Sequence, residues 1–160
     1  MSVNLEKRTV REGDDELLEE AWALKEGIRR REGVLKQRRG FFARSYRRST
    51  VHTYLAPDVD DLVGFASVRS DGYLLFLAVA PEYRGEGFGK RLVAHAVEAH
   101  PRVTCHARTT NGNALDFYRY LGFEVVRRID NYYEDGGDAY YLRLGEAEGL
   151  TDRLSSLLRR

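Results

Sequence analysis

The first third of the chain combines one strand-like stretch with long runs of helical periodicity. Residues 3–10 alternate polar and apolar side chains, which predicts a short strand. Asp14 follows a turn and is a candidate helix cap. Over residues 17–28, apolar side chains recur every three or four positions, as on the buried face of an amphipathic helix. A second, basic helical region is expected next, interrupted by Gly33 and Gly40.

The rest of the chain is dominated by short apolar runs that predict strands. Residues 73–79 are nearly all apolar, as expected of a strand covered on both faces. The predicted strands are Thr50–Leu55, Leu62–Val68, Tyr73–Val79, Val103–Ala107, Phe123–Ile129 and Ala139–Leu144. Helices are predicted from Gly89 onward and over Asn113–Leu121, where Gly122 suits a left-handed C-terminal position. This order predicts an α/β (α+β) fold with one mixed sheet and helices on both faces.

Length and composition indicate one globular domain, which we assign to residues 1–145 of the 160. Residues 146–160 are expected to form a tail or a short amphipathic helix. No run approaches the roughly 18 apolar residues of a membrane span, and residues 1–10 lack the apolar core of a secretory signal. The single cysteine, Cys105, excludes an internal disulfide and a thiolate zinc cluster, so we expect a reducing, cytoplasmic compartment and no metal.

Positive charge gathers in one segment, although the formal net charge is only +1. Nine Lys and Arg residues lie between Arg29 and Arg48, and Glu32 is the only acid among them. A solvated helix face explains such a run. The alternative is a docking surface for RNA, the ribosome or an acidic substrate.

The most informative stretch, residues 79–92, joins a buried strand, a proline and three glycines that lead into a helix. Glycine has no Cβ, so the backbone N–H groups near Gly85, Gly87 and Gly89 can approach a ligand closely. These amides lie at a helix N-terminus, where unpaired donors and the helix dipole favour an anion. The loop is therefore predicted to hold a diphosphate.

Two common nucleotide-binding patterns are excluded for this loop. Its glycines do not follow G-x-G-x-x-G, and Gly89-Lys90 is followed by arginine rather than by Ser or Thr. The loop instead reads Arg-x-x-Gly-x-Gly at Arg84, Gly87 and Gly89, after a Val-x-Pro at 79–81. This resembles the acetyl-CoA-binding motif of the GNAT family of N-acetyltransferases, in which the loop holds the pyrophosphate of coenzyme A.

Residues 106–123 resemble the second motif of that family, Asn-x-x-Ala-x-x-x-Tyr-x-x-x-Gly-Phe. Its positions are filled by Asn111, Ala114, Tyr118, Gly122 and Phe123. With their flanking elements the two motifs cover about residues 65–144, in the family's order and separation. The resemblance implies the GNAT fold, with about seven strands, a sheet splayed at strands 4 and 5, and acetyl-CoA as co-substrate.

Within the family, the C-terminal half is most similar to protein N-terminal acetyltransferases, including enzymes that modify ribosomal proteins. His106 lies on the strand where some of them place a base, and residues 131–140 resemble their last hairpin, whose tyrosines help to clamp the peptide. Residues 28–48 depart from them, because an aromatic-proline substrate loop is missing. The acceptor amine is therefore left open.

Acetyl transfer to an amine needs a base, a stabilised oxyanion and an acid for the leaving thiolate. His106, with an ordinary pKa of about 6.5, is the candidate base, or else a core histidine. Tyr118 is the candidate acid, because a phenol of pKa about 10 can protonate a thiolate whose acid has a pKa of about 8.5. Tyr83 matches a second catalytic tyrosine of some relatives, or else is an exposed aromatic residue of the loop. Tyr132 and Tyr133 are candidates for the acceptor site, or else pack the hairpin.

A free backbone N–H on the strand before Pro81 is expected to face the thioester oxygen. The cofactor-binding residues implied in all are Leu77, Ala78, Val79, Arg84, Gly85, Glu86, Gly87, Phe88, Gly89, Lys90, Asn111, Asn113 and Tyr118. Cys105 is expected to be a buried apolar residue. His52, His95 and His100 are expected at the surface or at helix ends.

Three functions follow from these interpretations. The first is an acetyl-CoA-dependent N-acetyltransferase that acts by direct attack in a ternary complex, with a peptide or protein N-terminus as acceptor. The second is an acetyltransferase of small-molecule amines. The third is a non-catalytic module that binds acyl-CoA and docks on RNA or the ribosome through Arg29–Arg48, with salt-dependent affinity.

Overall fold

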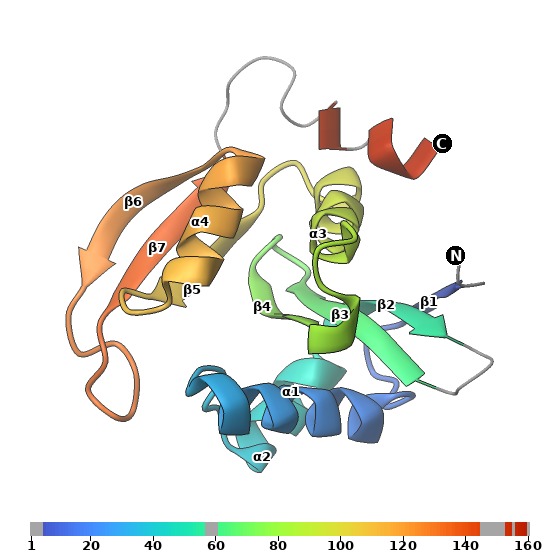
Figure 1. Cartoon of the computed structure of the whole chain (residues 1–160), viewed down its shortest axis with the longest axis horizontal. Helices are drawn as coiled ribbons and strands as arrows, with labels where there is room; N and C mark the ends of the chain where they lie inside the picture. The colour runs from blue at the N-terminus through green and yellow to red at the C-terminus, as the bar shows by residue number, and fades with distance from the viewer. Residues whose placement is uncertain (1–4, 57–60, 145–152, 155, 160) are drawn as a thin grey trace.

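The computed structural model describes residues 5–56, 61–144, 153–154 and 156–159. The strands are β1 (Glu6–Val10), β2 (Ser49–Ala56), β3 (Asp61–Arg69), β4 (Leu74–Val79), β5 (Thr104–Arg108), β6 (Phe123–Ile129) and β7 (Ala139–Leu144). The helices are α1 (Leu18–Glu32), α2 (Arg39–Arg47), α3 (Phe88–Ala99) and α4 (Gly112–Leu121), with short 3-10 turns η1 (Pro81–Tyr83) and η2 (Leu157–Arg159). This is the order of strands and helices that the sequence predicts (Figure 1).

The strands form two antiparallel hydrogen-bonded sheets. Strands β1 to β4 pair in sequence order in the first sheet, and the second has the order β5-β7-β6. Between β4 and β5 the described residues make one parallel bridge, Tyr73 with Thr104, where the Thr104 N–H donates to the Gly72 carbonyl at 3.2 Å. The predicted seven strands and the splay at strands 4 and 5 are confirmed (Figure 1). The expected single mixed sheet is instead two antiparallel sheets, because the parallel pairing of β4 with β5 is limited to this one bridge.

Gly72 fixes the point from which the two sheets diverge. Its φ of +87° lies in the left-handed region that side chains disfavour. A Cβ at this position would lie 1.9 Å from the Arg102 carbonyl oxygen, which no side chain can accommodate. The close approach of the two chain segments here therefore requires glycine.

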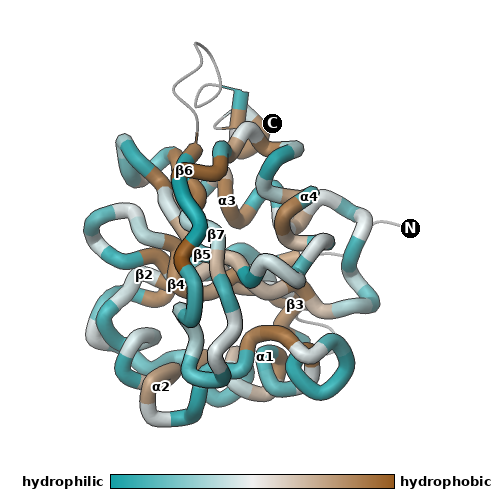
Figure 2. Tube along the Cα trace, turned by 90° about the vertical axis from the view of Figure 1, so that its left-hand side faces the viewer, coloured by the Kyte–Doolittle hydropathy of each residue, from teal (hydrophilic) through white to brown (hydrophobic). Residues whose placement is uncertain are grey.

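Helices cover both faces of the first sheet. Helices α1 and α2 lie on one face, over a cluster in which the Phe42 ring packs 4.8 Å from Phe76 and 6.2 Å from Phe65 between centroids. Helix α3 lies on the other face, in a second cluster that joins Leu92 to Leu142 of the second sheet. The hydrophobic stretches of the strands lie towards the middle of the molecule, and many outer loops are hydrophilic (Figure 2).

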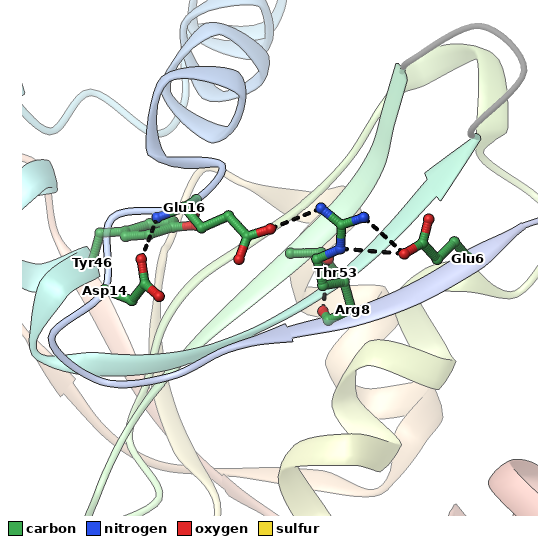
Figure 3. Close-up of polar contacts among 6 residues, drawn as sticks. All are labelled: Glu6, Arg8, Asp14, Glu16, Tyr46 and Thr53. Atoms are coloured by element: carbon green, nitrogen blue, oxygen red, sulfur yellow. Dashed lines mark hydrogen bonds and ion pairs between the residues drawn. The ribbon is translucent and has the colours of Figure 1, made fainter.

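Polar contacts fix the start of α1 (Figure 3). The Asp14 carboxylate accepts the Glu16 N–H at 2.9 Å, and the Tyr46 hydroxyl donates to the Glu16 carbonyl. Arg8 pairs with the Glu16 carboxylate at 2.8 Å and so ties the turn to β1. The prediction that Asp14 caps the helix is wrong, because Leu17 is the N-cap residue and Asp14 bonds within the preceding turn.

The connection between α1 and α2 differs from the expected broken helix. Gly33 ends α1 with a φ of +70°, and Leu35 also adopts a positive φ, of +55°. Residues 33–38, which we call the acceptor loop, are therefore non-helical. Helix α2 begins at Arg39 and contains Gly40 in its first turn instead of being interrupted there.

The basic segment 29–48 is partly neutralised within the molecule. Ion pairs join Arg29 to Glu26, Lys36 to Asp135, Arg38 to Glu134, Arg39 to Glu19 and Arg47 to Asp15. These pairs explain much of the charge clustering without a partner. Contact with RNA or the ribosome stays a prediction.

Two of the three histidines assigned to the surface or to helix ends lie elsewhere. His52 is 7% exposed on β2 and stacks on His95 of α3, with ring centroids 5.3 Å apart. The Tyr54 hydroxyl lies 2.8 Å from His95 Nε2. Burial and the nearby Lys7 lower the pKa of His52 to about 3. The prediction is wrong because strand β2 runs through the sheet beneath α3, which places His52 inside.

The C-terminal segment contributes to the core. Leu154 is 4% exposed and belongs to the cluster around α3, with Leu157 and Leu158 partly buried beside it. This fits the amphipathic alternative for the described part of 146–160, whereas Leu150 lies outside the described residues. No helix within the described ranges is long and apolar enough to cross a membrane.

Candidate active site

A cavity of about 740 Å³ lies where β4 and β5 diverge. Its wall is formed by the end of α1, the acceptor loop, β4, the glycine loop, the first turn of α3, β5, α4 and the hairpin after β6. The cavity therefore connects the predicted diphosphate loop with the predicted acceptor side in one continuous space.

The edge of β4 that faces the cavity carries free backbone donors. The Ala80 N–H donates to the Val63 carbonyl at 2.8 Å, and Ala78 lies opposite Phe65 in the same register. Because N–H direction alternates along an antiparallel strand, the Leu77 and Val79 N–H groups point away from β3. They face the side on which β5 has diverged, so they can donate to a bound group.

The glycine loop presents a set of unpaired amides. Gly85 and Gly87 have φ values of +82° and +86°, a conformation that glycine adopts without strain. Gly87 is the N-cap of α3 and has no side chain to satisfy the helix end, and the Arg91 N–H makes the first helical bond, to Gly87, at 3.1 Å. The amides of residues 88–90 are thus available to an anion.

Close packing fixes the direction of these amides. A Cβ on Gly89 would lie 3.1 Å from the Phe117 ring, so α3 approaches α4 here more closely than most side chains allow. The side chain of Asn111 caps α4 by accepting the Ala114 N–H at 3.2 Å. Both helices are therefore held firmly at the ends that line the cavity.

Arg84 is bound to α1. Its guanidinium forms a two-point ion pair with Glu32, at 2.8 and 2.9 Å, and its Nε donates to the Val79 carbonyl at 3.2 Å. The contact with Arg84 lowers the pKa of the Glu32 carboxyl. The end of α1 is thereby tied to the glycine loop, although 52 residues separate the partners in sequence.

Tyr118 of α4 is a buried phenol beside the thiol of Cys105. Burial raises the pKa of Tyr118 well above its usual value, and the neighbouring Cys105 adds to the effect. Burial likewise raises the pKa of Cys105 to about 12. Both groups therefore hold their protons at neutral pH. Cys105 is 1% exposed, as expected of a buried apolar residue.

His106 of β5 lies among tyrosines. The Tyr73 hydroxyl is 2.5 Å from its Nδ1, and the Tyr132 ring stacks on the imidazole with centroids 4.3 Å apart. Burial, and secondly the charge of Arg127, lower the pKa of His106, so the ring is neutral at pH 7. His106 lines the cavity, whereas Tyr73 and Tyr132 do not.

Charged side chains connect the hairpin, β5 and the acceptor loop at the rim. Arg108 stacks 4.0 Å above the Tyr133 ring and pairs with Asp135 at 3.0 Å. Lys36 pairs with the same carboxylate at 3.2 Å. These contacts hold the pKa of Asp135 well below its usual value, with Arg108 as the largest cause. Burial raises the pKa of Tyr133 to about 12.

The structure brings most of the predicted site residues together. The cavity is lined by the predicted residues Leu77, Ala78, Val79, Tyr83, Arg84, Gly85, Gly87, Phe88, Gly89, Lys90, His106, Asn111, Asn113, Tyr118 and Tyr133. Glu86 and Tyr132 do not line it: Glu86 is exposed on the loop, and Tyr132 stacks on the ring of His106.

Sequence reasoning missed Glu32, Leu35 and Arg108, all of which line the cavity. Arg108 lies two residues after His106, so strand alternation would have placed both on one face. The sequence does not indicate the conformation at Leu35, because leucine rarely adopts a positive φ.

Comparison with known proteins agrees with this geometry. Residues 49–125 match a family described as an acetyltransferase (GNAT) domain. N-alpha-acetyltransferase 30 of Saccharomyces cerevisiae is 35% identical over 97 residues, which cover 58% of this chain and 55% of the yeast protein. The chain spans about half the length of the curated relatives it matches.

Solved structures share the fold over nearly their whole length. The ribosomal-protein-S18-alanine N-acetyltransferase of Escherichia coli gives a TM-score of 0.70 at 21% identity, covering 89% of this chain and 97% of that one. Arabidopsis thaliana Naa50, solved with the bisubstrate analogue CoA-Ac-MVNAL, gives 0.67 at 23% identity, covering 89% and 99%. The predicted resemblance to the GNAT family is confirmed over residues 49–125, the part of the chain that matches the acetyltransferase (GNAT) domain.

Proposed function

We propose that this protein transfers the acetyl group of acetyl-CoA to the amine of a peptide or protein N-terminus. The observation that carries the proposal is the single cavity that joins the α3 amides, the free edge of β4, the Tyr118 phenol and the His106 imidazole. Each of these supplies one requirement of amide formation from a thioester.

Backbone groups of α3 and β4 suit the binding of acetyl-CoA, the acetyl donor. The amides at the start of α3 suit a diphosphate, because they combine unpaired donors with the positive end of the helix dipole. Lys90, which also lines the cavity, adds a positive charge. The free edge of β4 suits the amide-containing arm of coenzyme A, which can pair with it as a strand would.

The transfer step then uses three groups. The amine nitrogen attacks the thioester carbon, and the Leu77 or Val79 N–H stabilises the oxyanion that forms. The C–S bond breaks as the intermediate collapses. Before the attack the ammonium loses one proton to His106, directly or through water. On collapse Tyr118 gives its proton to the thiolate of coenzyme A, and the second proton, which the nitrogen releases as the amide forms, returns to the Tyr118 phenolate.

The tyrosines around His106 determine which of its nitrogens is free. Nδ1 is turned towards Tyr73, so Nε2 is the nitrogen left for the acceptor. If Nδ1 donates to the Tyr73 oxygen, Nε2 carries the lone pair that a base needs. The lowered pKa keeps that lone pair available near pH 7.

Charge at the acceptor end favours a peptide over a polycation. Among the described residues that line the cavity, Glu32 is the only carboxylate, and Arg84 already pairs with it. A polyamine or a cationic antibiotic would have to compete for the nearby carboxylates, because Glu32 is held by Arg84 and Asp135, at the rim, by Arg108 and Lys36. A peptide presents one ammonium, which loses its proton, and an otherwise polar backbone.

A screen with acetyl-CoA tests the proposal. The acceptors are unblocked peptides with varied first residues, the same peptides blocked at the N-terminus but carrying a lysine, and a set of polyamines and cationic antibiotics. Release of free CoA thiol is the readout. We expect turnover with unblocked peptides. Turnover confined to small amines or to lysine side chains would show that the acceptor is not a peptide N-terminus. No turnover with any amine would overturn the proposal.

Replacement of the phenol tests the acid. Tyr118→Phe keeps the buried ring and removes the proton donor, so kcat should fall about 10- to 100-fold, at the low end for general acids because a thiolate of pKa about 8.5 leaves readily. KM for acetyl-CoA should change less than about twofold. A variant with the wild-type kcat would show that Tyr118 only packs the core.

The pH dependence of kcat at saturating substrates tests the base. Burial lowers the pKa of His106, so the ring stays neutral down to a pH below about 6.5. The kcat of the wild type should hold its plateau to that pH and fall below it as the imidazole takes up a proton. His106→Gln should lower the plateau and remove this acid limb. An unchanged acid limb in the variant would assign the base to another group.

A further inference from the structure

Lys25 is a lysine buried inside the protein next to the acceptor side of the cavity. It lies on the buried face of α1, between Ala21 and Ile28, and its side chain is 0% exposed. Lysine is rarely buried in this way, because an ammonium loses its hydration unless other groups replace it. The buried ammonium of Lys25 therefore needs specific partners in place of water.

Three contacts replace the water around the ammonium. Nζ donates to the backbone carbonyl of Gln37 and lies 4.6 Å above the centre of the Trp22 ring. The Glu26 carboxylate is 3.9 Å away. The hydrogen bond to Gln37 joins the middle of α1 to the far end of the acceptor loop, 12 residues later.

The acceptor loop forms one wall of the cavity. Val34, Leu35 and Gln37 line it, and Leu35 holds a positive φ of +55°, a conformation that leucine rarely adopts. Such a backbone persists only when its surroundings hold it in place. The loop therefore needs an anchor close to Leu35.

The outer contacts of the loop are weak anchors. Lys36 pairs with Asp135 and Arg38 with Glu134, but the side chains of the second pair are 83% and 79% exposed. Exposed ion pairs hold a loop only slightly. The contact from Lys25 comes from a fully buried side chain, is assisted by charge and acts on the backbone, so it restrains the loop more strongly.

We propose that Lys25 is a positioning residue for the acceptor site: its buried ammonium holds the Gln37 carbonyl and thereby fixes the cavity wall formed by Leu35 and Gln37. This inference rests on the proposed function. Lys25 itself does not line the cavity, so it acts on the acceptor only through the loop.

The replacement Lys25→Met separates this role from simple packing. Methionine fills a similar volume, and replacing a buried charge by an apolar side chain is often tolerated by the fold. The variant should raise KM for the peptide acceptor about tenfold and change KM for acetyl-CoA less than twofold. Lys25→Arg keeps a charged donor and should restore most of the acceptor affinity.

Arg30→Met is the matched control, because it removes an exposed cation from the same helix and should leave both KM values within twofold of wild type. Limited trypsin digestion gives a readout that does not depend on activity. Cleavage after Lys36, Arg38 or Arg39 should be at least fivefold faster in Lys25→Met than in wild type or Arg30→Met. If the methionine variant does not fold, Lys25→Leu, which also lacks a hydrogen-bond donor, takes its place with the same expected results.

The outcomes distinguish this inference from the proposed function. Unchanged acceptor KM and unchanged trypsin cleavage in Lys25→Met would overturn the inference, as would an equal rise in KM for both substrates. If the wild type acetylates no amine, the proposed function fails first, and accelerated cleavage in the acceptor loop would still support the hold of Lys25 on Gln37.

Discussion

The divergence of β4 from β5 beyond one backbone bridge is the constraint on which the rest of the site depends. The bridge between Tyr73 and Thr104 holds the two sheets together at one point, and Gly72 allows the chain segments to approach there. Beyond it, the backbone donors of Leu77 and Val79 have no strand partner in the described structure. Unpaired backbone groups in a protein interior are costly, so this edge is suited to a ligand that completes the pairing.

Burial then adjusts the chemistry of the side chains around the opening. The same desolvation raises the pKa of Tyr118 and lowers the pKa of His106, because in each case it disfavours the charged form. At neutral pH the phenol keeps a proton to give, and the imidazole keeps a lone pair to receive one. In the proposed reaction, one physical cause thus prepares both the acid and the base.

Helix α1 connects the two ends of the cavity. Its last residue, Glu32, pairs with Arg84 of the glycine loop, and Lys25 in its middle holds the Gln37 carbonyl of the acceptor loop. The start of the helix is fixed by Asp14, Tyr46 and Arg8 through the turn at Glu16 (Figure 3). Because the start of α1 is anchored, its contacts hold both the glycine loop and the acceptor loop in fixed positions.

Much of this arrangement could be predicted from local sequence. Strand β6 and strand β7 have the predicted bounds, and Gly122 ends α4 with a φ of +107°, because apolar periodicity and glycine act over a few residues. The glycine loop was found in the same way. The pairs Arg84–Glu32 and Tyr73–His106 join residues 52 and 33 positions apart, and no local pattern reports them.

The burial of Lys25 and His52 could not be predicted from local sequence either, because a polar residue is buried only when distant segments supply its partners. The conformation of the acceptor loop could not be predicted for a related reason. Its conformation at Leu35 runs against the preference of the residue and is held by contacts from other elements.

A titration of the isotope-labelled chain with coenzyme A, followed through the backbone amide resonances, tests whether the free edge of β4 and the start of α3 bind the cofactor. Saturable shifts are expected at Leu77, Val79 and residues 87–90, with the exposed amides of β6 unchanged. Saturable shifts confined to other elements, or none at all, would show that coenzyme A does not bind there.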